Sequence, residues 1–233
     1  MAYVGSEYNE FNRFTNIDSI ESKIINHLIY SHTLYAETIW RLLKYDDDRA
    51  LCNNSTHSDV SEEERLELVE GFAEPSSGTT SDIRLYLTPF TDDAWTSQSS
   101  SVYIYVEDIY ATDHLKSDVV VSVDTVTHSK INAIISDQEN PNNTYYEDLD
   151  SPDAPTVKIK SRETTLVKCL IAELNGLYLD GIGYLQFNNF SSEGTTEKAN
   201  STFTMFNGRS YFGHKTKFNV NYAEVSDNSD IGY

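Results

Sequence analysis

A chain of 233 residues can bury the core of one large domain or two small ones, and its formal charge of −20 disfavours specific binding of duplex nucleic acid through a basic surface. The many Asn, Ser, Thr and Asp residues, together with 16 Tyr, favour a β-rich protein with long polar loops. No apolar run approaches the roughly 18 residues that span a bilayer, and the first residues lack a signal-peptide pattern. We therefore expect a chain made in a reducing cytoplasm, with no membrane contact.

The first expected elements are two amphipathic helices. Asp18 and Glu21 form the pattern of a capping box, and the aliphatic residues that follow recur at helical spacing. SHT at 31–33 interrupts the pattern, and a second apolar stripe then accompanies Trp40. Residues 1–17, which precede the first helix, are expected to form an extended N-terminal arm.

A polar loop and a short acidic helix come next, over residues 45–71. The loop contains the run DDDR, which invites a metal interpretation, but a calcium loop would need a central Gly and a closing Glu. Cys52 follows instead, so we expect a solvated loop. Ser61 and Glu64 make a second capping box, and Gly71 is expected to end the helix.

From residue 72 the hydrophobic period changes from helical to strand-like. The segments 82–90, 99–110 and 118–136 are expected to form an antiparallel meander, the last of them with a bend or a short break. DQENPNNTYYEDLDSPD then reads as an acidic loop or protruding arm at 137–153. Its acidic residues, accompanied by no basic one, are Asp137, Glu139, Glu147, Asp148, Asp150 and Asp153.

The remaining elements are a strand, a long helix and a β-hairpin. After PTVKIKS, Ser161 is expected to cap a helix over 162–178 that packs on the sheet. Two later strands surround NG at 207–208, a signal for a two-residue hairpin turn, and 226–233 reads as a tail. The predicted fold is a single α+β domain over 18–225, with N-terminal helices, an antiparallel β-sheet meander with a packed helix, and a C-terminal β-hairpin.

The predicted strand 99–110 has an unusual second face. In SSSVYIYVEDIY the aliphatic residues point to one side and tyrosines to the other, where a half-buried strand would carry charges. Tyrosine suits a surface that is wet in a free subunit and dry in an assembly, although sheet packing is the ordinary alternative. The candidate residues for a subunit interface are Tyr103, Tyr105, Trp95, Tyr145 and Tyr146.

The sequence contains no recognisable catalytic constellation. The six His lack metal-ligand spacing, and there is no Walker loop, Rossmann glycine pattern or G-x-S-x-G elbow. Cys52 and Cys169 lie in contexts that do not suggest a bridge, and His128 is expected to be partly buried at the end of a strand. We therefore predict a protein that is not an enzyme, with no catalytic residue, cofactor or metal.

Five stretches in order carry a family resemblance over about residues 20–187: AETIWRLLKYDDDRAL, DIRLYLTPF, SSSVYIYVEDIY, SDVVVSVDTVTHSKI and TTLVKCLIAELNGL. This order resembles the neck proteins of tailed bacteriophages, namely tail-terminator, head-closure and connector ring proteins. It is most similar to ring proteins of crAss-like phages. Residues 188–233 have no counterpart in the resemblance.

The resemblance implies a structural virion protein, assembled in the host cytoplasm. Such a subunit would form a ring with itself, six- or twelve-fold, between the portal and other neck or tail proteins. Duplex DNA would pass through the ring as an unbound cargo, which suits an acidic lumen. The acidic segment 137–153 would then line that lumen or contact an adjacent ring, and residues 1–17 would dock on a neighbour.

Two other functions stay open at this point. A carbohydrate- or receptor-binding β-rich domain of a virion or surface protein would use Trp95 in DDAWTSQ as a stacking platform, unless Trp95 fills a loop or interface pocket. A hydrolase with carboxylates dispersed along the chain is the third possibility, and it has no site signature in its favour.

Overall fold

The fold is known from a computed structural model, which describes residues 18–52, 57–71, 83–89, 98–111, 116–135, 159–180, 182–187, 201–206 and 210–223. Several predictions fall outside these residues. They concern the arm 1–17, the acidic segment 137–153 with Tyr145 and Tyr146, the tail 226–233, and Trp95. These stay predictions.

The described chain has runs of helices and runs of strands, as an α+β protein does. In chain order the elements are α2 (Asp18–Tyr30), α3 (Leu34–Lys44), α4 (Glu62–Glu67), β1 (Leu85–Tyr86), β2 (Ser100–Ala111), β3 (Lys116–His128), the 3-10 turn η2 (Ser129–Ile131), β4 (Ala133–Ile135), β5 (Ile159–Ser161), α5 (Arg162–Leu174), β6 (Tyr178–Leu179), β7 (Gly183–Phe187), β8 (Ser201–Phe206) and β9 (Tyr211–Ala223). The predicted fold class is confirmed, with its N-terminal helices and its helix packed on a sheet.

The helix ends follow local signals in the sequence. Both bonds of the predicted capping box form at α4, where Ser61 Oγ accepts from Glu64 N at 3.3 Å and Glu64 Oε2 accepts from Ser61 N at 3.0 Å. Ser161 caps α5 as predicted, by accepting from Thr164 N at 3.3 Å. The helix ends at Leu174, earlier than expected, because Gly176 adopts a φ of 85° and turns the chain away.

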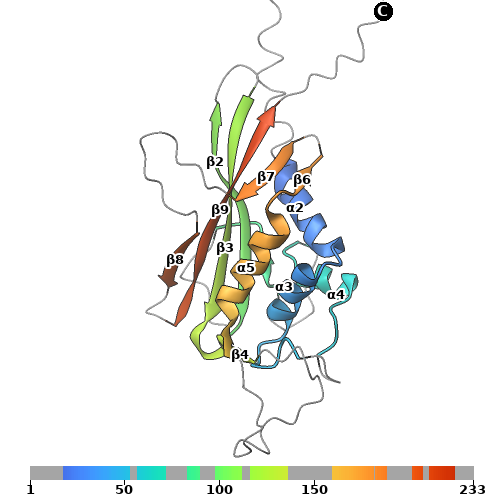
Figure 1. Ribbon diagram of the computed structural model, residues 1–233, viewed down its shortest axis with the longest axis vertical. Helices are drawn as coiled ribbons and strands as arrows, with labels where there is room; N and C mark the ends of the chain where they lie inside the picture. Colours follow the sequence, from blue (N-terminus) through green and yellow to red (C-terminus); the bar gives the residue numbers. More distant parts are fainter. Residues whose placement is uncertain are drawn as a thin grey trace, which may run out of the picture.

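The main sheet has the order β1-β2-β3-β9-β7-β6, with β8 also paired to β9 (Figure 1). The predicted antiparallel pairing of β2 with β3 is confirmed, with a bulge between Val106 and Asp108. The prediction for 82–90 is wrong in length and direction, because only β1 forms there and it runs parallel to β2. Its backbone also bonds to the residues after α4, with Arg84 N and Leu85 N both donating to Leu68 O.

The C-terminal hairpin is confirmed, although its turn is longer than predicted. β8 and β9 pair antiparallel, with Phe206 opposite Tyr211, so four residues connect them instead of the two expected from NG. β9 then continues beside β3 along its whole length. The predicted bend after β3 is also confirmed, because η2 follows His128 and the next strand, β4, leaves the sheet to pair with β5.

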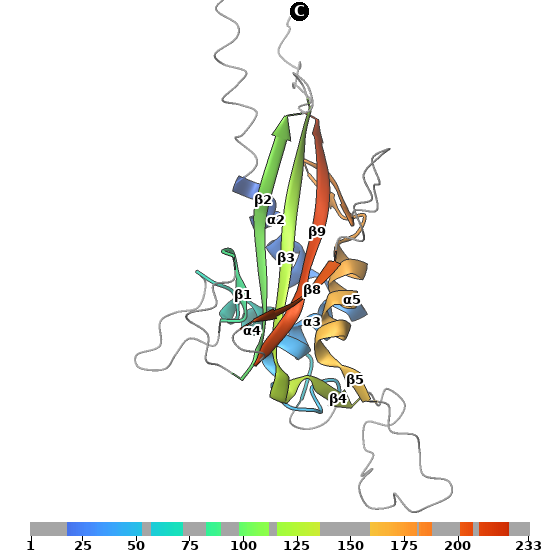
Figure 2. The same cartoon turned by 90° about the vertical axis from the view of Figure 1, so that its left-hand side faces the viewer.

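The main core lies between the sheet and three helices. α2, α3 and α5 cover one face of the sheet, whereas β8, which pairs with β9 in the same sheet, lies away from these helices in both views (Figures 1 and 2). Val102, Ile104 and the odd-numbered valines of β3 meet the helices in one apolar cluster. Trp40 is fully buried in this cluster, and its ring N–H donates to Leu28 O at 2.7 Å. This arrangement leaves the second face of β2, with its tyrosines, on the side away from the helices.

Candidate functional site

Tyr103 and Tyr105 lie on the sheet face opposite the helices, as their positions in the strand predict, and both are buried within the chain. Their exposed fractions are 5% and 8%, and they pack in a small cluster with Val126 and Tyr211. The ring of Tyr86 stacks on Tyr103 at a centroid distance of 4.8 Å. The chain itself therefore covers these rings, and they leave little surface for a second subunit. Subunit contact through them stays a prediction.

A network of side-chain hydrogen bonds runs across this face from β2 to β9. Tyr105 Oη donates to Asp124 Oδ2 at 2.8 Å and accepts from Lys215 Nζ at 3.1 Å. Burial raises the pKa of Asp124, and the bond from Tyr105 and the charge of Lys215 oppose that rise only in part. Asp124 Oδ1 is buried and has no hydrogen-bond partner among the described residues. The site thus holds a carboxylate whose charge is poorly compensated.

Glu107 pairs with two lysines at the end of this hydrogen-bond network. Ser122 Oγ donates to its Oε2 at 2.7 Å, while Lys215 Nζ and Lys217 Nζ lie 3.0 Å and 3.1 Å from its Oε1. Burial acts to raise the pKa of Glu107, but these three donors outweigh it and hold the pKa below its ordinary value. The two carboxylates on this face therefore have pKa values shifted in opposite directions, Asp124 upward and Glu107 downward.

Gly213 lies at a close approach between β9 and β3. A Cβ atom at this position would lie 1.6 Å from the carbonyl oxygen of Thr125, so only glycine fits. Its partner in β3 is Val126, a member of the tyrosine cluster. The close approach holds β9 against β3, the strand that pairs with the tyrosine-bearing strand β2.

Buried Glu173 ties the C-terminal end of α5 to the turn between α2 and α3. Its Oε1 accepts from Ser31 Oγ at 2.6 Å and lies 2.9 Å from His27 Nε2, and its Oε2 accepts from Thr33 Oγ1. Its side chain is 3% exposed. At the other end of the helix, buried Glu163 pairs with His214 of β9. Both ends of α5 are thus fixed by carboxylates that its neighbours satisfy.

Arg162 organises the loop that the sequence marks as a possible metal site. Its guanidinium is fully buried and donates to Leu42 O at 2.7 Å, Tyr45 O at 2.6 Å and Asp47 O. Burial lowers the pKa of Arg162 to about 10, so the group stays charged at neutral pH, favoured by Asp46 and its neighbours. The predicted solvated loop is therefore wrong for its backbone, whose carbonyls bind a cation of the chain itself.

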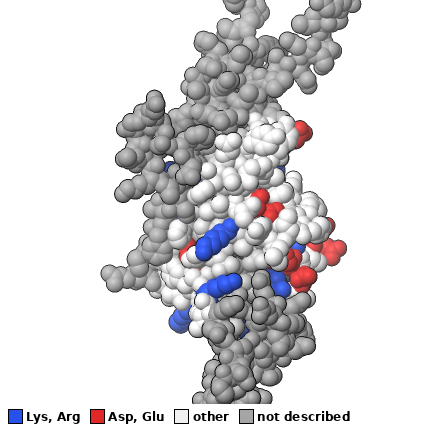
Figure 3. Space-filling model, viewed as in Figure 1, with Lys and Arg blue, Asp and Glu red and all other residues white. Residues whose placement is uncertain are grey.

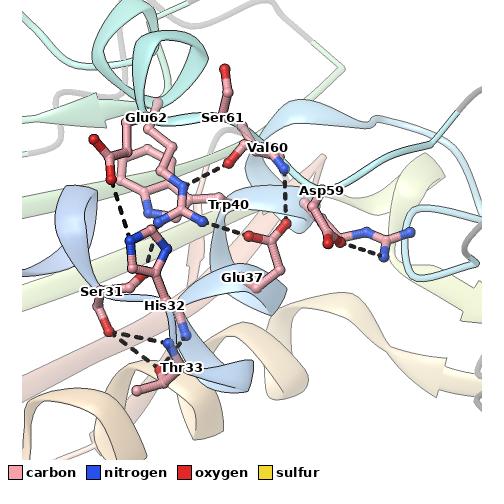
Figure 4. A network of polar contacts seen from close by, with 12 residues as sticks. Ser31, His32, Thr33, Glu37, Trp40, Asp59, Val60, Ser61 and Glu62 are labelled. Atoms are coloured by element: carbon pink, nitrogen blue, oxygen red, sulfur yellow. Dashed lines mark hydrogen bonds and ion pairs between the residues drawn. The ribbon is translucent and has the colours of Figure 1, made fainter.

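Two further arginines hold the loop from α3 to α4 in the same way. Arg65 Nη1 donates to Ile29 O at 2.8 Å, and its Nη2 pairs with Glu37. Glu37 also accepts from the N–H of Val60 at 2.9 Å, a contact seen in Figure 4. Arg41 donates to Ala50 O at 3.1 Å. These contacts are structural, because each guanidinium donates its hydrogen bonds to carbonyls and carboxylates of its own chain.

The described residues offer little for catalysis. No group of three or more His, Cys, Asp or Glu among them could hold a metal ion. Cys169 is a free thiol, but burial raises its pKa to about 11, so it is a poor nucleophile. His128 is buried as predicted, and burial followed by the charge of Lys130 lowers its pKa. It serves as a cap, since its Nδ1 accepts from Lys130 N at 3.1 Å.

Five of the seven large apolar side chains that are exposed among the described residues lie just after α5 or beside the turn that Glu173 contacts, and we call these five the tyrosine surface. Tyr178 of β6 faces Tyr184 of β7 across the strand pair, with ring centroids 5.0 Å apart and exposed fractions of 55% and 58%. Further members flank the turn that Glu173 holds. The full set is Tyr30, Leu34, Tyr35, Tyr178 and Tyr184. Sequence reasoning missed it, although tyrosines placed symmetrically around a tight turn were a usable signal.

The acidic excess is unevenly distributed along the chain. The described residues hold 13 of the 17 Lys and Arg residues and 19 of the 37 Asp and Glu residues, a difference of six negative charges. The remaining fourteen of the formal −20 belong to segments outside them. On the face that carries α5, Lys and Arg side chains gather over the lower half, and carboxylates lie towards the right-hand edge (Figure 3).

Comparisons of the chain with protein-family models, with curated proteins and with solved structures find no match. Among the described residues, every helix is too short or too polar to cross a bilayer. The functional argument therefore rests on the molecule's own surfaces.

Proposed function

We propose that the chain is a structural subunit of the neck of a tailed bacteriophage, and that it works by assembling into a ring between portal and tail. The family resemblance supplies this class of function, and the α+β fold agrees with it. In this proposal the protein performs no catalysis and localises to the virion. Its partners are other copies of itself, the portal and the neighbouring neck or tail proteins.

The observation that carries the proposal is the tyrosine surface. Large aromatic side chains that are more than half exposed, such as Tyr178 and Tyr184, leave apolar area in contact with water in a monomer. A lateral contact with another subunit would bury this area. Tyrosine is also enriched at the centres of protein interfaces. A ring subunit needs large lateral contacts of this kind.

The experiment is to mix the purified chain with portal protein and to examine the mixture by native mass spectrometry and electron microscopy. We expect a closed ring, and we expect Tyr184→Asp to abolish it without changing the thermal unfolding midpoint. Ile109→Asp is the matched control, because Ile109 is exposed but lies in β2, away from the tyrosine surface. A stable monomer with no affinity for any virion component would refute the proposal.

Carbohydrate binding is the second candidate, and the same pair of tyrosines favours it. Two adjacent exposed rings can stack on the apolar faces of sugars, as Tyr178 and Tyr184 are placed to do. A glycan array probed with the wild type and with Tyr184→Ala would separate the two functions. Binding that Tyr184→Ala abolishes, in a chain that stays monomeric, would favour the carbohydrate-binding function.

A further inference from the structure

A group of exposed lysines surrounds the N-terminal half of α5, at the opposite end of this helix from the tyrosine surface. Lys160 lies in β5, Lys168 lies on the outer side of α5, and Lys130 lies in η2. Ile159, next to Lys160, is 70% exposed. We call these four residues the lysine surface.

Contacts within the chain hold the lysine surface together. η2 is fixed to the start of α5, because Arg162 Nε donates to Ile131 O at 2.9 Å. Lys160 pairs with Ile134 in the β4–β5 ladder, and its strand leads directly into α5, the helix that carries Lys168. The three lysines therefore belong to one part of the surface.

The lysines of this surface are not compensated by carboxylates of the described residues. None of Lys130, Lys160 and Lys168 has an ion-pair partner among the described residues, and each is exposed. Lys44, Lys215 and Lys217 are instead paired with carboxylates, as Lys44 is with Glu64 at 2.6 Å. In a chain with a formal charge of −20, a patch of cations that the described carboxylates leave unpaired is a site for an acidic partner.

We propose that the lysine surface of one copy binds the acidic segment 137–153 of a neighbouring copy. This inference deepens the proposed ring and rests on it, since it names the two unlike surfaces that a head-to-tail contact requires. The segment carries six carboxylates and no cation, so its charge complements that of the lysines. Its few apolar side chains would cover Ile159.

The length of the chain between β4 and β5 allows this contact. Residues 136–158 leave the described fold at Ile135 and return at Ile159, which are partners in the β4–β5 ladder. Half of a connection of this length, when extended, spans at most about 40 Å. That reach exceeds the radius of a small domain, so the segment can extend to an adjacent subunit. Asp48 lies at one edge of the lysine surface, because its carbonyl accepts from Ile135 N at 2.7 Å.

Charge reversal on each partner provides the test. The lysine-reversed variant carries Lys130→Glu, Lys160→Glu and Lys168→Glu. The segment-reversed variant carries Glu147→Lys, Asp148→Lys, Asp150→Lys and Asp153→Lys. The control carries Ile109→Glu, an exposed position of β2 that adds negative charge away from both surfaces. Circular dichroism verifies that each variant is folded, as the exposure of the reversed lysines leads us to expect.

Self-association of the full chain is measured by analytical ultracentrifugation at low ionic strength. We expect each reversed variant to lose association at least tenfold, and we expect the two mixed together, or both sets in one chain, to restore it. The control is expected to associate like the wild type. About 1 M salt, where the Debye length is about 3 Å, is expected to weaken the wild type.

Carbodiimide cross-linking of a mixture of unlabelled and ¹⁵N-labelled chains identifies which copy supplies the segment. Cross-links from Lys160 or Lys168 to the segment that join chains of different label support the inference. Cross-links confined to one label would overturn it, because they would place the segment on its own subunit. Normal association of the lysine-reversed variant would also overturn it and leave the proposed ring intact, whereas loss of the ring itself in the wild type would remove both.

Discussion

Replacing Arg162 by methionine is expected to cost a large part of the protein's stability. Its guanidinium binds Leu42 O and Tyr45 O at the C-terminal end of α3, together with Asp47 O and Ile131 O. Carbonyls at a helix C-terminus lack partners within the helix, so this cation caps α3 from a residue more than 100 positions later in the chain. The methionine side chain matches the volume but donates no hydrogen bond.

The size of the loss follows from these four bonds. A buried carbonyl that loses its donor costs about 1–3 kcal/mol, with the lower end suited to the three partly buried acceptors, which gives about 5 kcal/mol. Removing a guanidinium that pays a desolvation penalty returns about 2 kcal/mol of this. The net loss is about 3 kcal/mol, a considerable fraction of the 5–15 kcal/mol typical of a folded domain.

Urea unfolding followed by circular dichroism measures the change. A loss of about 3 kcal/mol shifts the midpoint by about 1 M or more for an m-value of up to about 3 kcal/mol per molar. Lys168→Met is the matched control on the same helix, and because Lys168 is exposed we expect a change within about 0.5 kcal/mol. If Arg162→Met lies within about 1 kcal/mol of the wild type, the carbonyls find other donors and the reasoning is refuted.

Three further predictions concern stability, each measured by urea unfolding. Gly213→Ala is expected to lower the free energy of unfolding by about 3 kcal/mol, since its Cβ would meet Thr125 O. Gly176→Ala, which has a positive φ but open space around it, is expected to lower it by only about 1 kcal/mol. Equal losses for the two variants would contradict the steric clash at Gly213. Glu173→Gln is expected to lose about 2 kcal/mol, because an amide nitrogen would face donors, and an unchanged midpoint would show that the carboxylate is dispensable. Asp124→Asn is expected to stabilise the fold at pH 7 and to make no difference near pH 3. Because the pKa of Asp124 is raised in the folded protein, the protonated carboxyl favours the fold at a pH below the pKa of the unfolded chain. This contribution to stability is lost as the pH rises through the folded pKa. A destabilised Asp124→Asn at pH 7 would instead assign the larger effect to the attraction of Lys215.

The features that could be predicted from the sequence are those that depend on neighbouring residues. The capping box of Ser61 and Glu64 forms because both bonds close within one helical turn, and the cap at Ser161 does the same. The two faces of β2 follow from its alternation, so the side on which Tyr103 lies was predictable. What lies on that side was not predictable, because β9 returns to β3 from about 90 residues later in the chain.

The missed features depend on contacts over long sequence distances. β1 runs parallel to β2 because the residues after α4 accept the N–H groups of Arg84 and Leu85, a contact that no local pattern specifies. The position of Arg162 next to a helix cap gives no sign that carbonyls of 42–47 surround it. An aromatic pattern likewise cannot distinguish buried Tyr105 from exposed Tyr184, since both occupy alternating positions in strands.

The way in which the chain uses its cations makes the lysine surface stand out. Four of the five arginines that the structure describes are buried, namely Arg41, Arg65, Arg84 and Arg162, and they bind carbonyls or carboxylates of the fold. Arginine suits this use because its planar group donates several bonds in fixed directions. The cations left for the surface are mostly lysines, and several of these are paired with nearby carboxylates. In so acidic a chain, the lysines beside α5, which have no ion-pair partner among the described residues, therefore form a local attraction for carboxylates on a surface that otherwise repels other copies. Such an arrangement favours one relative orientation of two subunits over the rest, which is the requirement for a closed ring instead of an unordered aggregate.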